Sequence, residues 1–301
     1  MSAVVAVRSV EIGISNLERS TQFYRDVWAL DLVAEAGGKR YFRASGPDHH
    51  VLVIREAATA GILGIELALE SVDAVRELHA RSAPHAAEIE EPAAHTAPGG
   101  GFGFSMRDAC GRHWTLTAGA DVHGDVRTLA DRPYKLSHVV LNSPEVAAEA
   151  AQAMSAFGFR LRDESKSMLF LGCNADHHSL AFARGAGRSL NHIAFEVPSI
   201  DAVMRNAGRL KKDGFPLQWG VGRHGPGANV YSYFLDPDDL PIEYTAELMQ
   251  VDDATYQAGT PADWERPAFF DAWGLADPPT KRFLDASSGA LSIPPTAHVF
   301  S

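Results

Sequence analysis

The sequence is poor in cysteine and in long apolar runs. Its 301 residues include only two cysteines, Cys110 and Cys173, which lie far apart. A disulfide framework is therefore not expected, and reduced thiols in a cytoplasm are the default. No apolar run is long enough to cross a bilayer, and the first residues lack the layout of a signal peptide. We therefore expect a cytoplasmic protein without a membrane partner.

Positive charge is also scarce. Lysine and arginine total 27 against 38 acidic residues, which gives a formal net charge of −11, and the basic residues form no cluster. This balance argues against a nucleic-acid partner. The composition, 46% hydrophobic and 22% charged, is that of an ordinary globular protein with a sizeable core and two domains.

The chain contains an internal repeat. The stretches "SVEIGISNLERSTQFYRDVWALDLVAE" from Ser9 and "LSHVVLNSPEVAAEAAQAMSAFGFRLRDE" from Leu136 each predict a strand, a capped helix and a second strand. Ser15 or Asn16 is the candidate cap of the first helix, and Ser143 is that of the second. Both units end in a predicted hairpin around an aspartate, in "FGFSMRDACGRHWTLTAG" and "VYSYFLDPDDLPIEYTAE". The same supersecondary unit is therefore used twice, which predicts an α+β fold.

Two aperiodic stretches and a tail divide this pattern. Residues 82–101 predict a long loop inside the first unit, and 119–133 a linker. Phe269, Phe270 and Trp273 make the tail too aromatic for a disordered segment, so we expect it to pack on the body. The sequence thus predicts a first domain (1–122), a second domain (133–247) and a packed tail (248–301).

Three polar residues interrupt apolar strands of the second unit: His138, His192 and Glu243. Each alone is more often a hydrogen-bonded or surface residue than a metal ligand. Together they match the two-histidine, one-carboxylate face that holds Fe(II), and they also suit Mn(II). A cation would offset the cost of a buried carboxylate, and the lack of a thiolate argues against structural zinc.

The first unit offers no complete counterpart of these three residues. The alignment of the repeats places Glu11 at the position of His138 and Thr115 at that of Glu243, with an ambiguous partner of His192 near Glu66. We therefore expect this unit to bind no metal.

Further candidates lie near the same face. His178 precedes an apolar strand, His224 ends "GVGRH", and Tyr233 begins the hairpin that leads to Glu243. For these three residues a structural role is about as plausible as a catalytic one from the sequence. We expect the neighbouring His177 to point the other way, toward the surface.

With its "GRH" triplet, Gly-rich turn and "YSYFLDPDDLPIEY" hairpin, the chain resembles the type I extradiol ring-cleavage dioxygenases of the vicinal oxygen chelate superfamily. The resemblance implies two βαβββ modules per unit, which close into a partial barrel. It also implies that His138, His192 and Glu243 bind Fe(II), with Mn(II) as the alternative, in extradiol cleavage of a catechol by O2 during aromatic compound degradation. In that role His178 is the acid–base residue, with His177 as the alternative register, and His224 and Tyr233 contact the substrate. We further expect a homo-oligomer.

The substrate expectation depends on two departures from the family pattern. Trp219 and Phe170 stand where homoprotocatechuate-cleaving members have an arginine and a tryptophan. These residues imply a substrate-binding pocket for an uncharged ring substituent, unless Lys281 or Arg282 of the tail supplies the positive charge.

Two other functions remain open from the sequence. A glyoxalase-like isomerase of the same superfamily would draw its metal ligands from both units. A binding module of the bleomycin-resistance type would need neither the three ligands nor the acid–base histidine, and would leave these residues unexplained.

Overall fold

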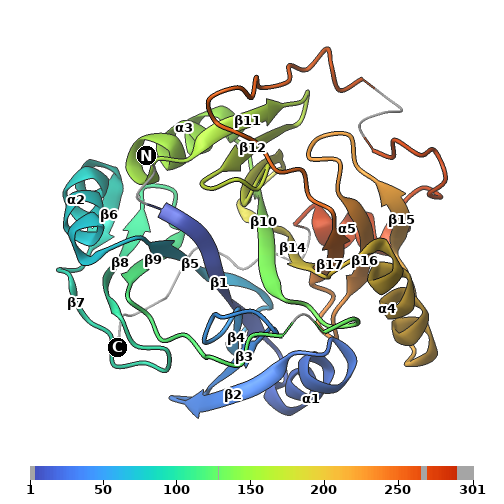
Figure 1. Ribbon diagram of the computed structural model, residues 1–301, viewed down its shortest axis with the longest axis horizontal. Helices are drawn as coiled ribbons and strands as arrows, with labels where there is room; N and C mark the ends of the chain where they lie inside the picture. The colour runs from blue at the N-terminus through green and yellow to red at the C-terminus, as the bar shows by residue number, and fades with distance from the viewer. Residues whose placement is uncertain (1–3, 128, 266–269, 290–301) are drawn as a thin grey trace.

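The computed structural model describes residues 4–127, 129–265 and 270–289, which form two mixed β-sheets flanked by a few helices (Figure 1). Within these residues the first sheet holds β1 (Val4–Ile14), β2 (Asp31–Ala36), β3 (Lys39–Arg43), β4 (Leu52–Glu56), β5 (Gly61–Leu69), β6 (Ala86–Ile89), β7 (Ala93–Ala94), β8 (Phe102–Asp108) and β9 (His113–Ala118). The second sheet holds β10 (Lys135–Ser143), β11 (Arg160–Glu164), β12 (Met168–Gly172), β13 (Leu180–Arg184), β14 (Ser189–Glu196), β15 (Trp219–Arg223), β16 (Val230–Leu235) and β17 (Pro241–Ala246).

Helices follow matching strands of the two units, and one more helix lies in the tail. They are α1 (Leu17–Gln22), which continues as a π-helical turn (Phe23–Val27), α2 (Val72–Ser82), followed by a 3-10 turn (Ala83–His85), α3 (Val146–Phe157), α4 (Ile200–Lys212) and α5 (Lys281–Ser287). No helix in this described part of the chain is both long and apolar enough to cross a membrane.

The strand orders of the two sheets correspond one to one. They run β2-β3-β4-β1-β5-β9-β8-β6 and β11-β12-β13-β10-β14-β17-β16-β15, with β7 added beside β8. In each sheet an antiparallel central pair, β1 with β5 or β10 with β14, joins two βαβββ modules. The α+β fold with tandem modules, predicted from the repeat, is confirmed.

Local sequence explains most of the helix starts. Asn16, Ser71 and Ser199 each accept a backbone hydrogen bond at the N-cap of a helix. The prediction that Ser143 caps the second unit's first helix is wrong, because α3 begins later, at Val146. The Ser143 hydroxyl instead accepts a hydrogen bond from the backbone N–H of Glu145. The predicted loop at 82–101 also contains two short strands, which pair with β8.

The two sheets share one apolar core. The rings of Trp28 and Tyr244 stack with centroids 3.8 Å apart, and the Tyr244 hydroxyl donates to the Trp28 carbonyl at 2.7 Å. Tyr24 from the first unit donates to the buried Asp236 at 2.8 Å. Burial of aromatic surface and satisfied buried hydroxyls together bind the units to each other.

The tail returns to the second sheet instead of leaving the body. The backbone N–H of Val251 donates to Ala175, and α5 contacts β14 and β17 (Figure 1). Phe283 of α5 is buried, whereas Trp273 is 40% exposed. Of the three aromatic residues that suggested packing, Phe269 lies outside the described residues.

Candidate functional site

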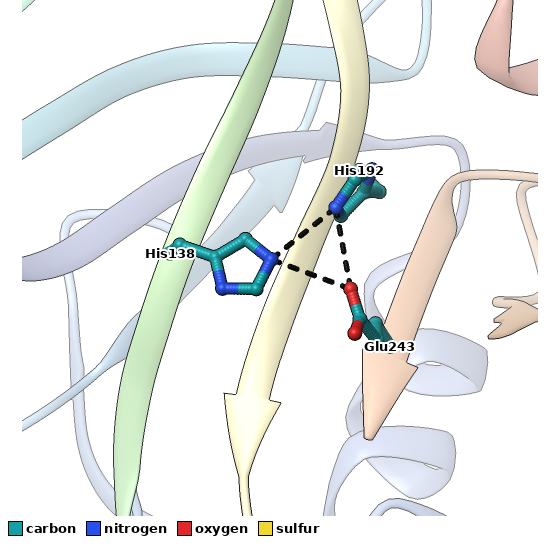
Figure 2. A group of neighbouring side chains, drawn as sticks. All are labelled: His138, His192 and Glu243. Atoms are coloured by element: carbon teal, nitrogen blue, oxygen red, sulfur yellow. Dashed lines mark hydrogen bonds and ion pairs between the residues drawn. The ribbon is translucent and has the colours of Figure 1, made fainter. Parts of the chain in front are cut away.

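Three neighbouring strands bring His138, His192 and Glu243 together. His138 lies on β10 opposite Ala194 of β14, and Ala194 lies beside Glu243 of β17. His192 is two residues from Ala194 and therefore shares its face of the sheet. Figure 2 shows the three side chains converging from these strands, and one ligand atom from each lies within 4.8 Å of the others.

The donor atoms of this cluster suit a cation. Glu243 is fully buried, and its Oε2 lies 3.4 Å from His138 Nε2 and 3.2 Å from His192 Nε2. The same Oε2 accepts no hydrogen bond from the described residues. A buried carboxylate oxygen without a donor is costly, and a metal ion between these three atoms would remove that cost. The residues therefore fit a divalent metal with two imidazoles and one carboxylate.

The remaining polar atoms of the cluster have partners that orient it. The Ser137 hydroxyl lies 3.1 Å from His138 Nδ1, and the side-chain Oδ1 of Asn191 lies 2.8 Å from His192 Nδ1. Asn229 donates to Glu243 Oε1 at 3.3 Å. Such contacts leave each Nε2 for a metal and fix the direction of each ring.

In the first sheet the corresponding positions are Ser9, Gly64 and Thr115. The alignment of Glu11 with His138 is therefore wrong by two residues, and Glu66 corresponds to Ala194 and not to His192. Glu11 instead pairs with Lys39 at 2.8 Å and with Arg55 at 2.6 Å. Among the described residues, the second sheet alone carries a complete group of ligands.

A cavity of about 570 Å³ opens in front of the metal-ligand cluster. Its wall combines His138 and His192 with the other predicted site residues, namely His178, His224, Tyr233, Trp219 and Phe170. The tail closes one side through Pro278, Pro279, Phe283 and Leu284. The structure thus gathers every sequence-predicted site residue around one cavity, with Glu243 beneath its floor.

His178 faces this cavity beside His138, with ring centroids 4.4 Å apart. Its Nδ1 lies 3.0 Å from Nδ1 of His177, so Nε2 is the nitrogen left for a substrate. His177 itself is fully buried. The expectation of a surface position for His177 is wrong, because the tail covers this side of the strand: Tyr256 stands 2.9 Å from His177 Nε2.

His224 and Tyr233 form a pair on the other side of the cavity. His224 Nε2 lies 2.9 Å from the Tyr233 hydroxyl, and the His224 ring stacks on Tyr231 with centroids 3.9 Å apart. Trp219 stacks on Tyr233 at 5.2 Å and contacts Phe283. This aromatic packing fixes the direction in which the Tyr233 hydroxyl points.

Burial disfavours the charged forms of His178 and His224. It lowers the pKa of His178 well below its usual value, and the neighbouring histidines lower it further. It likewise lowers the pKa of His224 to about 4. Burial and the charge of Glu243 raise the pKa of Tyr233 well above its usual value, so this hydroxyl keeps its proton. At neutral pH the site therefore offers a neutral imidazole base and a hydroxyl donor.

Among the described residues of the tail, no lysine or arginine lines the cavity. Lys281 pairs with Asp285 and Arg282 with Asp239, and both cationic side chains are largely exposed. Two acidic residues of the tail, Asp271 and Asp277, line the cavity instead. The possibility that Lys281 or Arg282 supplies a cation is therefore wrong, since one turn of α5 directs both side chains outward.

Several polar neighbours were not predicted from the sequence. Asp163 contacts His177 at 2.9 Å from a strand fourteen residues away, and Tyr256 joins them from the tail. Asp271 accepts four backbone N–H groups, including that of Arg223. Nothing in the local pattern marks Asp163 and Tyr256, because their partners are distant in sequence.

Comparison with known proteins gives a consistent result. The family model of the Glyoxalase/Bleomycin resistance protein/Dioxygenase superfamily matches residues 6–116 and 135–244. Metapyrocatechase 2 of Cupriavidus necator is 34% identical over 133 residues, which cover 43% of this chain and 41% of that protein. An iron-dependent extradiol dioxygenase of Rhodococcus jostii (strain RHA1) is 30% identical over 139 residues, 41% of this chain and 46% of that protein. The matches thus span less than half of either relative.

Among solved structures, the Mn(II)-bound glyoxalase from Novosphingobium aromaticivorans superimposes with a TM-score of 0.86 at 36% identity. The match covers 94% of each chain. The tandem-module fold predicted from the sequence is thus also that of a solved relative.

Proposed function

Because the chain belongs to the Glyoxalase/Bleomycin resistance protein/Dioxygenase superfamily, we propose that it is an extradiol dioxygenase. The reaction is cleavage of a substituted catechol by O2, beside the two hydroxyl groups, at a mononuclear Fe(II) site held by His138, His192 and Glu243. The observation that carries the proposal is the meeting of these three ligands at a cavity whose wall holds His138 and His192 together with His178, His224 and Tyr233. The names of the two curated relatives, one an iron-dependent extradiol dioxygenase, support the same reaction.

A bound Fe(II) would supply a redox centre with open positions for the catechol oxygens and for O2. The chain's own residues handle protons and position. His178 is neutral and presents Nε2 to the cavity, so it can take a proton from a catechol hydroxyl and return it later. Tyr233 keeps its proton and can donate a hydrogen bond to a catechol oxygen on which negative charge develops, while His224 contacts the Tyr233 hydroxyl at 2.9 Å and orients it.

The aromatic wall defines the substrate class. Phe170, Trp219 and Phe283 offer apolar surface for a ring substituent, and no lysine or arginine is among the described residues that line the cavity. An alkyl, aryl or halogen substituent gains from burial against these rings. A carboxylate there would lose hydration without a cationic partner. We infer an uncharged substituent.

The test combines metal analysis with turnover. Protein purified without chelator, and protein loaded anaerobically with Fe(II) or with Mn(II), is assayed with a panel of substituted catechols for O2 uptake and for the yellow ring-fission product. One metal ion per chain and one O2 consumed per ring support the proposal. His178→Asn should keep the metal while kcat falls about 10²- to 10⁴-fold, because the proton carrier is lost. Fully loaded protein that cleaves no catechol would overturn the assignment.

A glyoxalase-like isomerase is the second candidate, and the Mn(II)-bound glyoxalase structure favours it. In that reading metal ligands come from both units, yet the first sheet offers Ser9, Gly64 and Thr115 at the matching positions. Isomerisation of the methylglyoxal–glutathione hemithioacetal by the Mn(II)-loaded protein, without ring cleavage of any catechol, would select it.

Size-exclusion chromatography with light scattering tests the proposed homo-oligomer, and the cytoplasmic location remains part of this proposal.

A further inference from the structure

A buried chain of hydrogen bonds runs from His178 away from the cavity. His178 Nδ1 contacts His177 Nδ1 at 3.0 Å, and His177 Nε2 contacts Asp163 Oδ2 at 2.9 Å. His177 and Asp163 are fully buried, and His178 is 3% exposed. Neither Asp163 nor His177 lines the cavity, so neither contacts a substrate.

Donors surround the Asp163 carboxylate. Oδ1 accepts the backbone N–H of Gly259 at 2.6 Å and the Tyr256 hydroxyl at 3.0 Å, and Oδ2 faces His177. The Gly259 N–H and the Tyr256 hydroxyl both donate to this carboxylate, and a carboxylate can only accept a hydrogen bond from His177. His177 must then carry its proton on Nε2.

The proton position on His177 determines which nitrogen of His178 carries a proton. A neutral His177 with a proton on Nε2 has only a lone pair on Nδ1. Two Nδ1 atoms 3.0 Å apart form a hydrogen bond only if one of them carries a proton, so His178 carries it on Nδ1. The Nε2 of His178 is therefore free of a proton and can act as a base.

The repeat supplies a natural comparison. In the first unit His49 and His50 contact each other through Nδ1 at 3.1 Å, as His177 and His178 do. The strand register places Ala34 at the position of Asp163, so the first unit has the histidine pair without the carboxylate behind it. The carboxylate accompanies the histidine pair only in the unit that also has the three metal ligands.

We propose that Asp163 and His177 are positioning residues that hold His178 in the tautomer whose Nε2 is free to take the substrate proton. The tail contributes through Tyr256 and Gly259, which hold the carboxylate in place. When His178 takes a proton on Nε2, its Nδ1–H continues to donate to His177, and no other proton has to move. The inference depends on the proposed role of His178 in the catechol reaction.

Asp163→Asn is the decisive variant. The fixed N–H of Gly259 requires the amide oxygen of Asn on its side, so the NH2 group points at His177. His177 Nε2 must then accept, its proton moves to Nδ1, and His178 is forced to hold its proton on Nε2. We expect kcat of the Fe(II)-loaded variant to fall at least about 100-fold. KM and metal content should change less than about threefold.

His177 gives a second test if Asp163→Asn folds poorly. His177→Gln keeps an acceptor for His178 Nδ1 and should retain kcat within about tenfold. His177→Leu has no acceptor and should lose at least about 100-fold. The matched control is His49→Gln in the first unit, which should leave kcat unchanged. Equal activities of the Gln and Leu variants, or an Asp163→Asn kcat within about threefold of wild type, would overturn the inference.

A spectroscopic readout separates this inference from the reaction itself. In protein loaded with diamagnetic Zn(II), ¹⁵N NMR should show the His178 proton on Nδ1 in the wild type and on Nε2 in Asp163→Asn, with His178→Asn for assignment. If no catechol is cleaved but the tautomer changes as described, the proposed function fails and the positioning role stands. An unchanged His178 tautomer in Asp163→Asn refutes the positioning role whatever the activity.

Discussion

A catechol that carries an acetate group should be a much poorer substrate than one that carries a methyl group. The perturbation is confined to the ring substituent, which meets Phe170 and Trp219 in the cavity wall. No lysine or arginine among the described cavity-lining residues offsets its charge, and Lys281 and Arg282 pair with Asp285 and Asp239 instead. Asp271, which also lines the cavity, adds negative charge.

The size of the difference in kcat/KM follows from the free energies of burying a methyl group and of burying a carboxylate. A methyl group buried against the aromatic wall gains about 0.8 kcal/mol. Full burial of an unpaired carboxylate costs several kcal/mol. A carboxylate that keeps part of its hydration would still lose about 1.4 kcal/mol or more of binding free energy. The difference of about 2 kcal/mol corresponds to roughly 30-fold in kcat/KM.

The assay compares initial rates of Fe(II)-loaded protein with 3-methylcatechol, 4-methylcatechol and 3,4-dihydroxyphenylacetate. Lys281→Ala and Arg282→Ala serve as controls and should leave the ratio of specificity constants unchanged. An acid that matches or exceeds the methylcatechols would refute the argument from the cavity wall. If that preference then disappeared in either alanine variant, the outward orientation of these side chains in solution would also be wrong.

Three further predictions concern the metal and the core. Metal at 100 times its Kd should raise the free energy of unfolding of the wild type by about 2.7 kcal/mol, which is measured as a higher Tm. His192→Ala should lose the bound metal, the rise in Tm and the activity. If this variant kept its metal, the assignment of His192 as a ligand would be refuted. Glu11→Gln should not change metal stoichiometry, because Glu11 pairs with Lys39 in the other sheet; metal loss would favour a site shared by both units. Tyr244→Phe should cost about 1–2 kcal/mol in urea unfolding, since its buried hydroxyl donates to Trp28; an unchanged midpoint would contradict this.

The repeat and the metal-ligand cluster could be predicted from the chain itself. Alternating strands and capped helices recur in both halves, and His138, His192 and Glu243 stand out because imidazole and carboxylate are rare among strand residues that are otherwise apolar. The structure places these three residues on one face of β10, β14 and β17. Period-2 alternation alone was enough to assign that face.

The alignment between the two units could not be obtained in the same way. A shift of two residues keeps every side chain on its face, so the hydrophobic pattern fits Glu11 and Ser9 equally well as partners of His138. Bulges in the pairing of β1 with β5 and of β10 with β14 shift the register further. Only the hydrogen-bonded ladder identifies Ser9 as the counterpart.

The sequence by itself determined the two-unit α+β fold and which residues could bind a metal, because both depend on short-range periodicity and side-chain chemistry. Tertiary structure decided what surrounds these residues. The return of the tail buries His177 against Tyr256, joins it to Asp163, and directs Lys281 away from the cavity. The contacts of Tyr256 with His177 and Asp163 connect segments 79 and 93 residues apart, and their geometry depends on packing of the whole chain, which local patterns do not encode.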